Sequence, residues 1–148
     1  MSGRLSVASI LALIFITVSA AAVSAQDYPN VKGVWTGTYK TAFLKGGKVL
    51  DGEDHGAQME LDVFKQDTNL IWAKIRWRVK ANREWNEEHT TGTFDLLEPT
   101  KLNIVQLPQN DDLRDAGFYE GHVKDGKMYL TFKGVGNGLS FAVMLERK

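Results

Sequence analysis

The strongest constraint in this 148-residue sequence is a strict alternation of apolar and polar side chains. Over residues 57–65, Met59, Leu61 and Val63 alternate with polar side chains, and residues 70–79 follow the same pattern. A period of two places all the apolar side chains on one face of a β-strand. The sequence therefore predicts strands with one face in a core and the other in water.

Turn-forming stretches divide the sequence into eight such segments. They span residues 33–41, 57–65, 70–79, 90–97, 101–107, 116–123, 127–133 and 139–147. Asp125-Gly126 is typical of a two-residue hairpin turn. Successive strands with short connections predict an all-β, eight-stranded antiparallel up-and-down β-barrel, because closure removes exposed edges. A two-sheet sandwich is the alternative, and a short helix is conceivable only at 81–88.

The first 25 residues have the parts of a secretory signal. Arg4 supplies a positive charge, residues 7–18 are largely apolar, and Val23-Ser24-Ala25 is of the type that signal peptidase cleaves. The alternative is an uncleaved anchor, but the apolar run is short for a span of roughly 20 residues. We expect cleavage of residues 1–25, a single barrel domain at 26–148, and no membrane partner after cleavage.

Charge and cysteine content narrow the class of protein. Basic and acidic side chains number 18 each, so no electrostatic attraction to nucleic acid is expected. The sequence has no cysteine, so an exported domain would depend on its core and on sheet closure instead of disulfides. These features, with the signal, predict a periplasmic or secreted bacterial protein.

Aromatic side chains on the inward faces are the candidates for a binding pocket. Ligand pockets are mostly apolar and aromatic with few polar groups, and Tyr39 and Trp77 each carry a polar tip that needs a partner when buried. Val79 and Leu96 are also expected inside. A filled core is the alternative use of the same residues. The predicted ligand contacts are Tyr39, Trp77, Phe94, Phe132 and Phe141.

Glu120 and His122 share one face of residues 116–123 with Phe118. Facing inward, they would form a titratable pair suited to proton transfer. The cost of burying charge favours the opposite orientation, with Tyr119 and Val123 inside. No nucleophile or phosphate-binding motif is present, so no catalytic residue and no enzyme activity are predicted.

The acidic stretch 51–55 contains carboxylates and one imidazole that could bind a divalent cation. The spacing of a calcium-binding loop is absent, so we expect a solvated loop, no metal site and no cofactor. Lys74, Arg76 and Arg78 form a basic stripe opposite Glu60 and Asp62, which is typical of a solvated outer wall. Such a wall suits a monomer or a weak homo-oligomer.

Gly33-Val34-Trp35 and Arg147 resemble the calycin superfamily, which joins lipocalins, fatty-acid-binding proteins and avidins. In calycins a first-strand Trp closes one end of the barrel and a basic residue of the last strand packs over it, by stacking and cation–π attraction. The resemblance implies that Trp35 and Arg147 form a structural plug. It also implies a ligand site away from this end, toward Tyr39 and Trp77.

Three short stretches are similar to avidin-type barrels: residues 36–39, residues 74–77 followed by 90–94, and residues 135–141. The Ser and Asn residues that avidins use for biotin are not found in register. We therefore expect an exported barrel that binds a small apolar or planar ligand other than biotin. The alternative is a periplasmic protein-binding module or inhibitor with a filled core, acting through its loops.

Overall fold

The computed structural model describes residues 27–45, 48–51, 56–108, 116–136 and 138–148. The predicted signal, most of the acidic loop and the loop 109–115 lie outside the described residues. The strands are β1 (Gly33–Lys45), β2 (Lys48–Asp51), β3 (Gln58–Asp67), β4 (Leu70–Arg78), β5 (Asn86–Phe94), β6 (Lys101–Gln106), β7 (Gly117–Lys124), β8 (Lys127–Gly134) and β9 (Ser140–Arg147).

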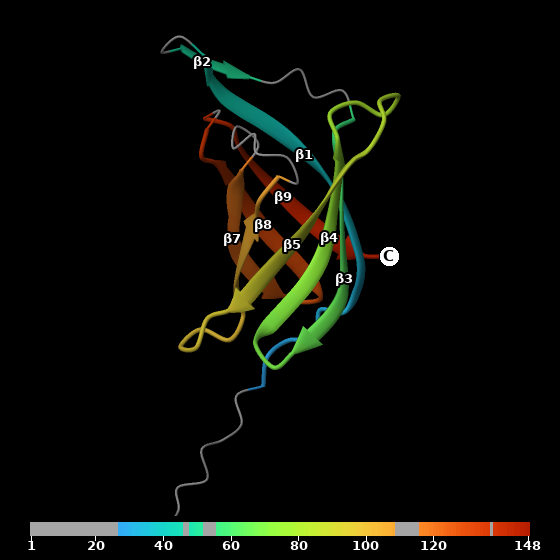
Figure 1. Cartoon of the computed structure of the whole chain (residues 1–148), viewed down its shortest axis with the longest axis vertical. Helices are drawn as coiled ribbons and strands as arrows, with labels where there is room; N and C mark the ends of the chain where they lie inside the picture. The colour runs from blue at the N-terminus through green and yellow to red at the C-terminus, as the bar shows by residue number, and fades with distance from the viewer. Residues whose placement is uncertain (1–26, 46–47, 52–55, 109–115, 137) are drawn as a thin grey trace, which may run out of the picture.

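Eight of these strands close into an antiparallel barrel (Figure 1). The order β1-β3-β4-β5-β6-β7-β8-β9 follows the chain, and β1 pairs back with β9. The short β2 pairs with the end of β1 that extends beyond the barrel. The prediction of an all-β, eight-stranded up-and-down barrel is confirmed, and the sandwich alternative is wrong. The described residues contain no helix, and β5 already begins at Asn86 within the segment considered for one.

The inward side chains form one continuous apolar core. It includes Met59, Leu61 and Val63 of β3, each no more than 1% exposed, as their alternation predicts. Two expected core residues are instead outside: Val79 is 51% and Leu96 is 68% exposed. Val79 lies just beyond the last residue of β4, and Leu96 lies in the turn after β5, so neither belongs to a paired strand that would hold it inward.

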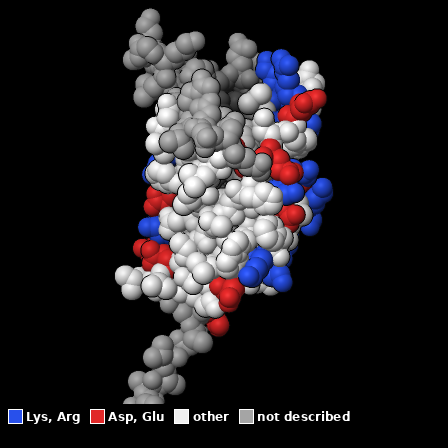
Figure 2. Space-filling model, viewed as in Figure 1, with Lys and Arg blue, Asp and Glu red and all other residues white. Residues whose placement is uncertain are grey.

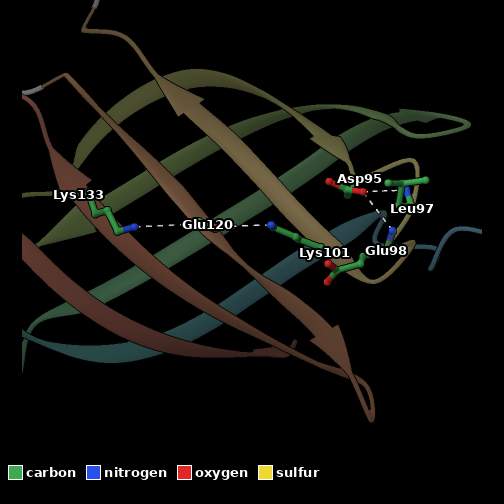
Figure 3. Close-up of polar contacts among 6 residues, drawn as sticks. All are labelled: Asp95, Leu97, Glu98, Lys101, Glu120 and Lys133. Carbon is green, nitrogen blue, oxygen red and sulfur yellow. Dashed lines mark hydrogen bonds and ion pairs between the residues drawn. The ribbon is translucent and has the colours of Figure 1, made fainter.

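The turn after β5 is fixed by Asp95, whose carboxylate accepts the backbone N–H groups of Leu97 and Glu98 at 2.7 and 3.0 Å (Figure 3). These two hydrogen bonds stabilise the charged form, so they lower the pKa of Asp95 below its usual value, with a smaller contribution from Lys101. A carboxylate that accepts the N–H groups two and three residues ahead is a common way to reverse a chain. Leu96 is therefore carried around the outside of the barrel.

The end of the barrel that holds Trp35 is closed by the N-terminal segment; we call it the Trp35 end. The indole N–H of Trp35 donates to the Val31 carbonyl oxygen at 2.8 Å. The guanidinium of Arg147 lies 4.7 Å from the centre of the Trp35 ring and donates to the Asn30 carbonyl oxygen at 2.7 Å. Gln66 also holds this segment, because its side chain accepts the Val31 N–H and donates to a neighbouring carbonyl oxygen.

Charged side chains lie on the outer wall, where basic and acidic groups alternate along the margins of the view in Figure 2. Lys74 pairs with Glu87 at 3.0 Å, and Arg76 pairs with Glu60. Trp85 lies over Arg76, 5.4 Å from its guanidinium carbon. The basic stripe therefore forms part of a solvated, internally neutralised wall.

Candidate ligand site at the far end of the barrel

The two ends of the barrel differ in the chemistry of their inward side chains. At the end opposite Trp35, which we call the far end, four polar side chains face inward among the residues whose burial is described. They belong to Glu88, which is 8% exposed, Thr90 (5%), Gln106 (3%) and Tyr119 (3%). Polar groups are costly to bury without hydrogen bonds and charges rarely occur in cores. Their concentration at one end marks it as the candidate site.

An aromatic cluster lies beside these polar groups. The rings of Tyr39 and Phe141 are stacked with centroids 4.4 Å apart, and Phe141 is stacked on Phe132 at 5.0 Å. Tyr119 completes the cluster, 4.8 Å from Phe132. The cluster thus joins β1, β9, β8 and β7. It brings together three of the five predicted ligand contacts with Tyr119, which was expected inside but not as a contact.

The other two predicted contacts lie apart from this cluster. Trp77 is half-buried at the far end of β4, packs against the core and pairs in register with Met59 and Asn86. Phe94 is the last residue of β5 and lies toward the Trp35 end, where its ring is 5.8 Å from that of Tyr28. Trp77 therefore shares the far end with the aromatic cluster, and Phe94 does not.

Tyr119 links the aromatic and polar parts of the site. Its hydroxyl donates to the side-chain oxygen of Gln106 at 2.8 Å. Burial raises the pKa of Tyr119 well above its usual value, and the charges of Tyr39 and Glu88 add to that effect. Tyr119 therefore stays neutral, and its hydroxyl oxygen can still accept a hydrogen bond.

Glu88 was missed by sequence reasoning, which began this strand only at residue 90. In the structure Glu88 pairs in register with the fully buried Ile75 of β4, and its side chain shares that inward face. The neighbours Glu87 and His89 are exposed. The signal was available: Glu88, Thr90 and Phe94 have the same parity, so extending the alternation back from Phe94 places Glu88 inside.

Glu120 and His122 face outward, so the hypothesis of a proton-transfer pair inside the barrel is wrong. Glu120 lies on the outer wall between Lys133 and Lys101, at 3.2 and 3.5 Å (Figure 3). Hydrogen bonding and charge from Lys133, then Lys101, lower the pKa of Glu120. His122 is exposed, whereas Tyr119 is buried on the opposite face. The cost of burying charge decides the orientation.

A cavity of about 540 Å³ lies on the outer wall over β7, β8 and β9. Its lining includes Glu120, His122, Tyr129 and Met144. All four side chains are at least partly exposed to water. This open surface lacks the buried polar groups that distinguish the far end.

No three histidine or acidic side chains of the described residues are grouped so as to hold a metal ion. Residues 52–55 of the acidic loop lie outside that part of the chain. Within the described ranges, no helix is long and apolar enough to cross a membrane.

Comparison with known proteins gives little beyond the fold. No protein-family model and no curated protein matches the chain. Among solved structures, a mutant of the fluorescent protein UnaG is similar over 79% of this chain and 95% of its own, with 14% identity and a TM-score of 0.43. A likeness of this size carries no argument about activity. The closed eight-stranded antiparallel barrel is the architecture that the resemblance to calycins implied.

Proposed function

We propose that the protein binds a small, largely apolar or planar ligand at the far end of its barrel. The observation that carries the proposal is the inward layer of stacked rings, with Tyr119 and Glu88 buried beside it. Stacked aromatic faces with a few convergent polar groups are the usual lining of a small-molecule site. The polar groups would orient a ligand that the rings hold by contact area.

The two ends of the barrel would then have separate roles. At the Trp35 end, the N-terminal segment covers the core and is held there by Gln66 and Arg147. At the far end, Trp77 is half-buried and Phe141 keeps 9% of its surface exposed. These two are the most accessible of the predicted contact residues, so we expect a ligand to meet them first.

A fluorescence titration with Nile red, a neutral planar dye, tests this proposal. Phe141→Leu should weaken dye binding by about tenfold, because the substitution removes a ring from the layer. Phe94→Leu is the matched control, since it shortens a buried phenylalanine toward the Trp35 end and should change the affinity less than about twofold. Equal effects of the two substitutions, or no binding of Nile red by the folded protein, would contradict the proposed site.

The proposal extends to the cellular location, since a binding barrel preceded by a secretory signal would act in the periplasm or outside the cell. Expression of the full chain in a bacterium should yield mature protein in the periplasmic fraction or medium. N-terminal sequencing should begin at Gln26. Retention of residues 1–25 on the recovered protein would contradict export by cleavage.

The second candidate is a protein-binding module, favoured by an apolar area on the outer wall. Val105 and Phe118 are register partners on β6 and β7 and are 50% and 42% exposed. Leu107 follows with 61% exposed. Figure 2 shows a largely uncharged centre to this view of the molecule. A filled barrel that failed to bind any apolar dye would make this candidate the better one.

A further inference from the structure

The far end of the barrel contains an acidic side chain, that of Glu88, which affects which ligands can bind there. Glu88 is 8% exposed, and its register with Ile75 places its side chain inside the wall. A carboxylate is among the most expensive groups to bury, and opposite charge and hydrogen-bond donors offset that cost. A ligand at the far end would therefore lie close to a carboxyl group.

The positive side chains whose burial is described lie around the outside. These are the lysines and arginines at positions 32, 65–101, 124–133 and 147–148, and none of them is buried. Glu60, the other buried carboxylate of the described residues, belongs to this outer arrangement, because it pairs with Arg76 and lies 3.9 Å from Lys148. The inward polar groups at the far end are instead a carboxylate, an amide and hydroxyls. None of these inward groups is basic.

Aromatic faces add to this preference. A positive charge is attracted to the face of an aromatic ring, most strongly where water is excluded. Tyr39, Phe141 and Phe132 present stacked rings inside the same end of the barrel, and Trp77 stands at its edge. Aromatic rings combined with a carboxylate are the recurrent chemistry for holding organic cations.

We propose that the ligand of the far end is an organic cation: an apolar or planar body that carries a protonated nitrogen held by Glu88. This inference rests on the proposed function and names the ligand class for the same site. The neutral hydroxyl of Tyr119 lies within electrostatic range of Glu88. Its oxygen can accept a further N–H from the ligand, so Glu88 and Tyr119 together would fix the position of the nitrogen.

Proflavine and acridine provide matched probes, because they share one planar ring system and only proflavine is a cation at neutral pH. The folded protein should bind proflavine at least about tenfold more tightly, since hydrogen bonds to charged groups are the stronger ones. Glu88→Gln should remove most of that preference and change acridine affinity less than about twofold. Glu87→Gln is the matched control, because Glu87 is adjacent, outward and paired with Lys74.

The outcomes separate the two proposals. Equal affinities of the unmodified protein for proflavine and acridine, or an equal loss of affinity for both dyes in Glu88→Gln, would overturn the proposal that the ligand is a cation. Either result would leave the proposed site in place. Failure of both dyes and of Nile red to bind would overturn the site itself. Should Glu88→Gln fail to fold, as judged by circular dichroism, the preference of the unmodified protein decides: a preference below twofold overturns the inference.

Discussion

Replacement of Trp35 with alanine tests how the barrel is held closed. The side chain is 2% exposed, and its N–H donates to the Val31 carbonyl oxygen at 2.8 Å. The Arg147 guanidinium lies 4.7 Å from the ring centre. Alanine removes the ring, the hydrogen bond and the cation–π contact together, and it leaves a cavity where β1 meets β9.

The expected loss follows from the buried surface of the ring. A fully buried tryptophan removes about 200 Å² from water, which at about 25 cal/mol per Å² corresponds to about 5 kcal/mol. That value is an upper bound, because the unfolded chain already buries part of this surface. Core substitutions of this kind cost roughly 3–5 kcal/mol. Trp35→Ala should therefore lower the free energy of unfolding by about 4 kcal/mol, a large share of the roughly 5–15 kcal/mol typical of a domain.

Urea unfolding followed by far-ultraviolet circular dichroism measures this change without depending on tryptophan fluorescence. Trp85→Ala is the matched control: Trp85 is 37% exposed and lies on the outer wall, 4.7 Å from the Arg78 guanidinium carbon. Its loss should cost less than about 1 kcal/mol. If Trp35→Ala costs no more than Trp85→Ala, the Trp35 ring and its contacts with Val31 and Arg147 do not hold this end closed.

Three further substitutions test other parts of the structure. Gly121→Ala would place a methyl carbon in steric overlap with the Tyr129 carbonyl oxygen on β8. Urea unfolding should therefore show that the free energy of unfolding falls by at least about 2 kcal/mol, and an unchanged value would refute the close approach. Because the pKa of Tyr119 is raised, its hydroxyl should ionise only in the unfolded chain just above about pH 10, and the free energy of unfolding should fall there. Tyr119→Phe should reduce this alkaline loss of stability, and identical pH profiles for the two proteins would argue against it. Because backbone N–H groups lower the pKa of Asp95, its contribution to stability is present above about pH 4 and is lost as the pH falls below that value. Asp95→Asn should therefore reduce the fall of the melting temperature at acid pH, and an unchanged fall would count against the role of Asp95 in the turn.

Within the paired strands, the alternation of apolar and polar residues correctly predicted which side chains face the core and which face the solvent. Met59 and Leu61 are buried as their parity indicates. Val79 and Leu96 continue the alternation in the sequence, but each lies just beyond the end of its strand. The alternation itself does not indicate where backbone pairing stops. Strand ends are set by turns such as that of Asp95, which compete with the ladder for the same N–H groups.

The candidate site could be predicted only in part, because it depends on how inward residues are distributed along the barrel axis. Strand tilt and stagger decide which inward side chains share an end, and they place Phe94 toward the Trp35 end but Phe141 at the far end. Glu88 could not be recognised from composition, since burial cost argues for placing any carboxylate outside. Its register with Ile75 shows that it faces inward.

The contact that closes the barrel also determines when the barrel can form. Arg147 donates to the carbonyl oxygen of Asn30, 117 positions earlier in the chain. The pairing of β1 with β9, from Trp35 with Arg147 to Ala42 with Ser140, also joins distant parts of the chain. The hairpins between successive strands are local and can form early, whereas joining the two edges depends on contacts between distant parts of the chain, which form more slowly. We therefore expect edge joining to be the slow step of folding. During synthesis, which proceeds from the N-terminus, the seven-strand sheet must wait with both edges open until β9 has been made.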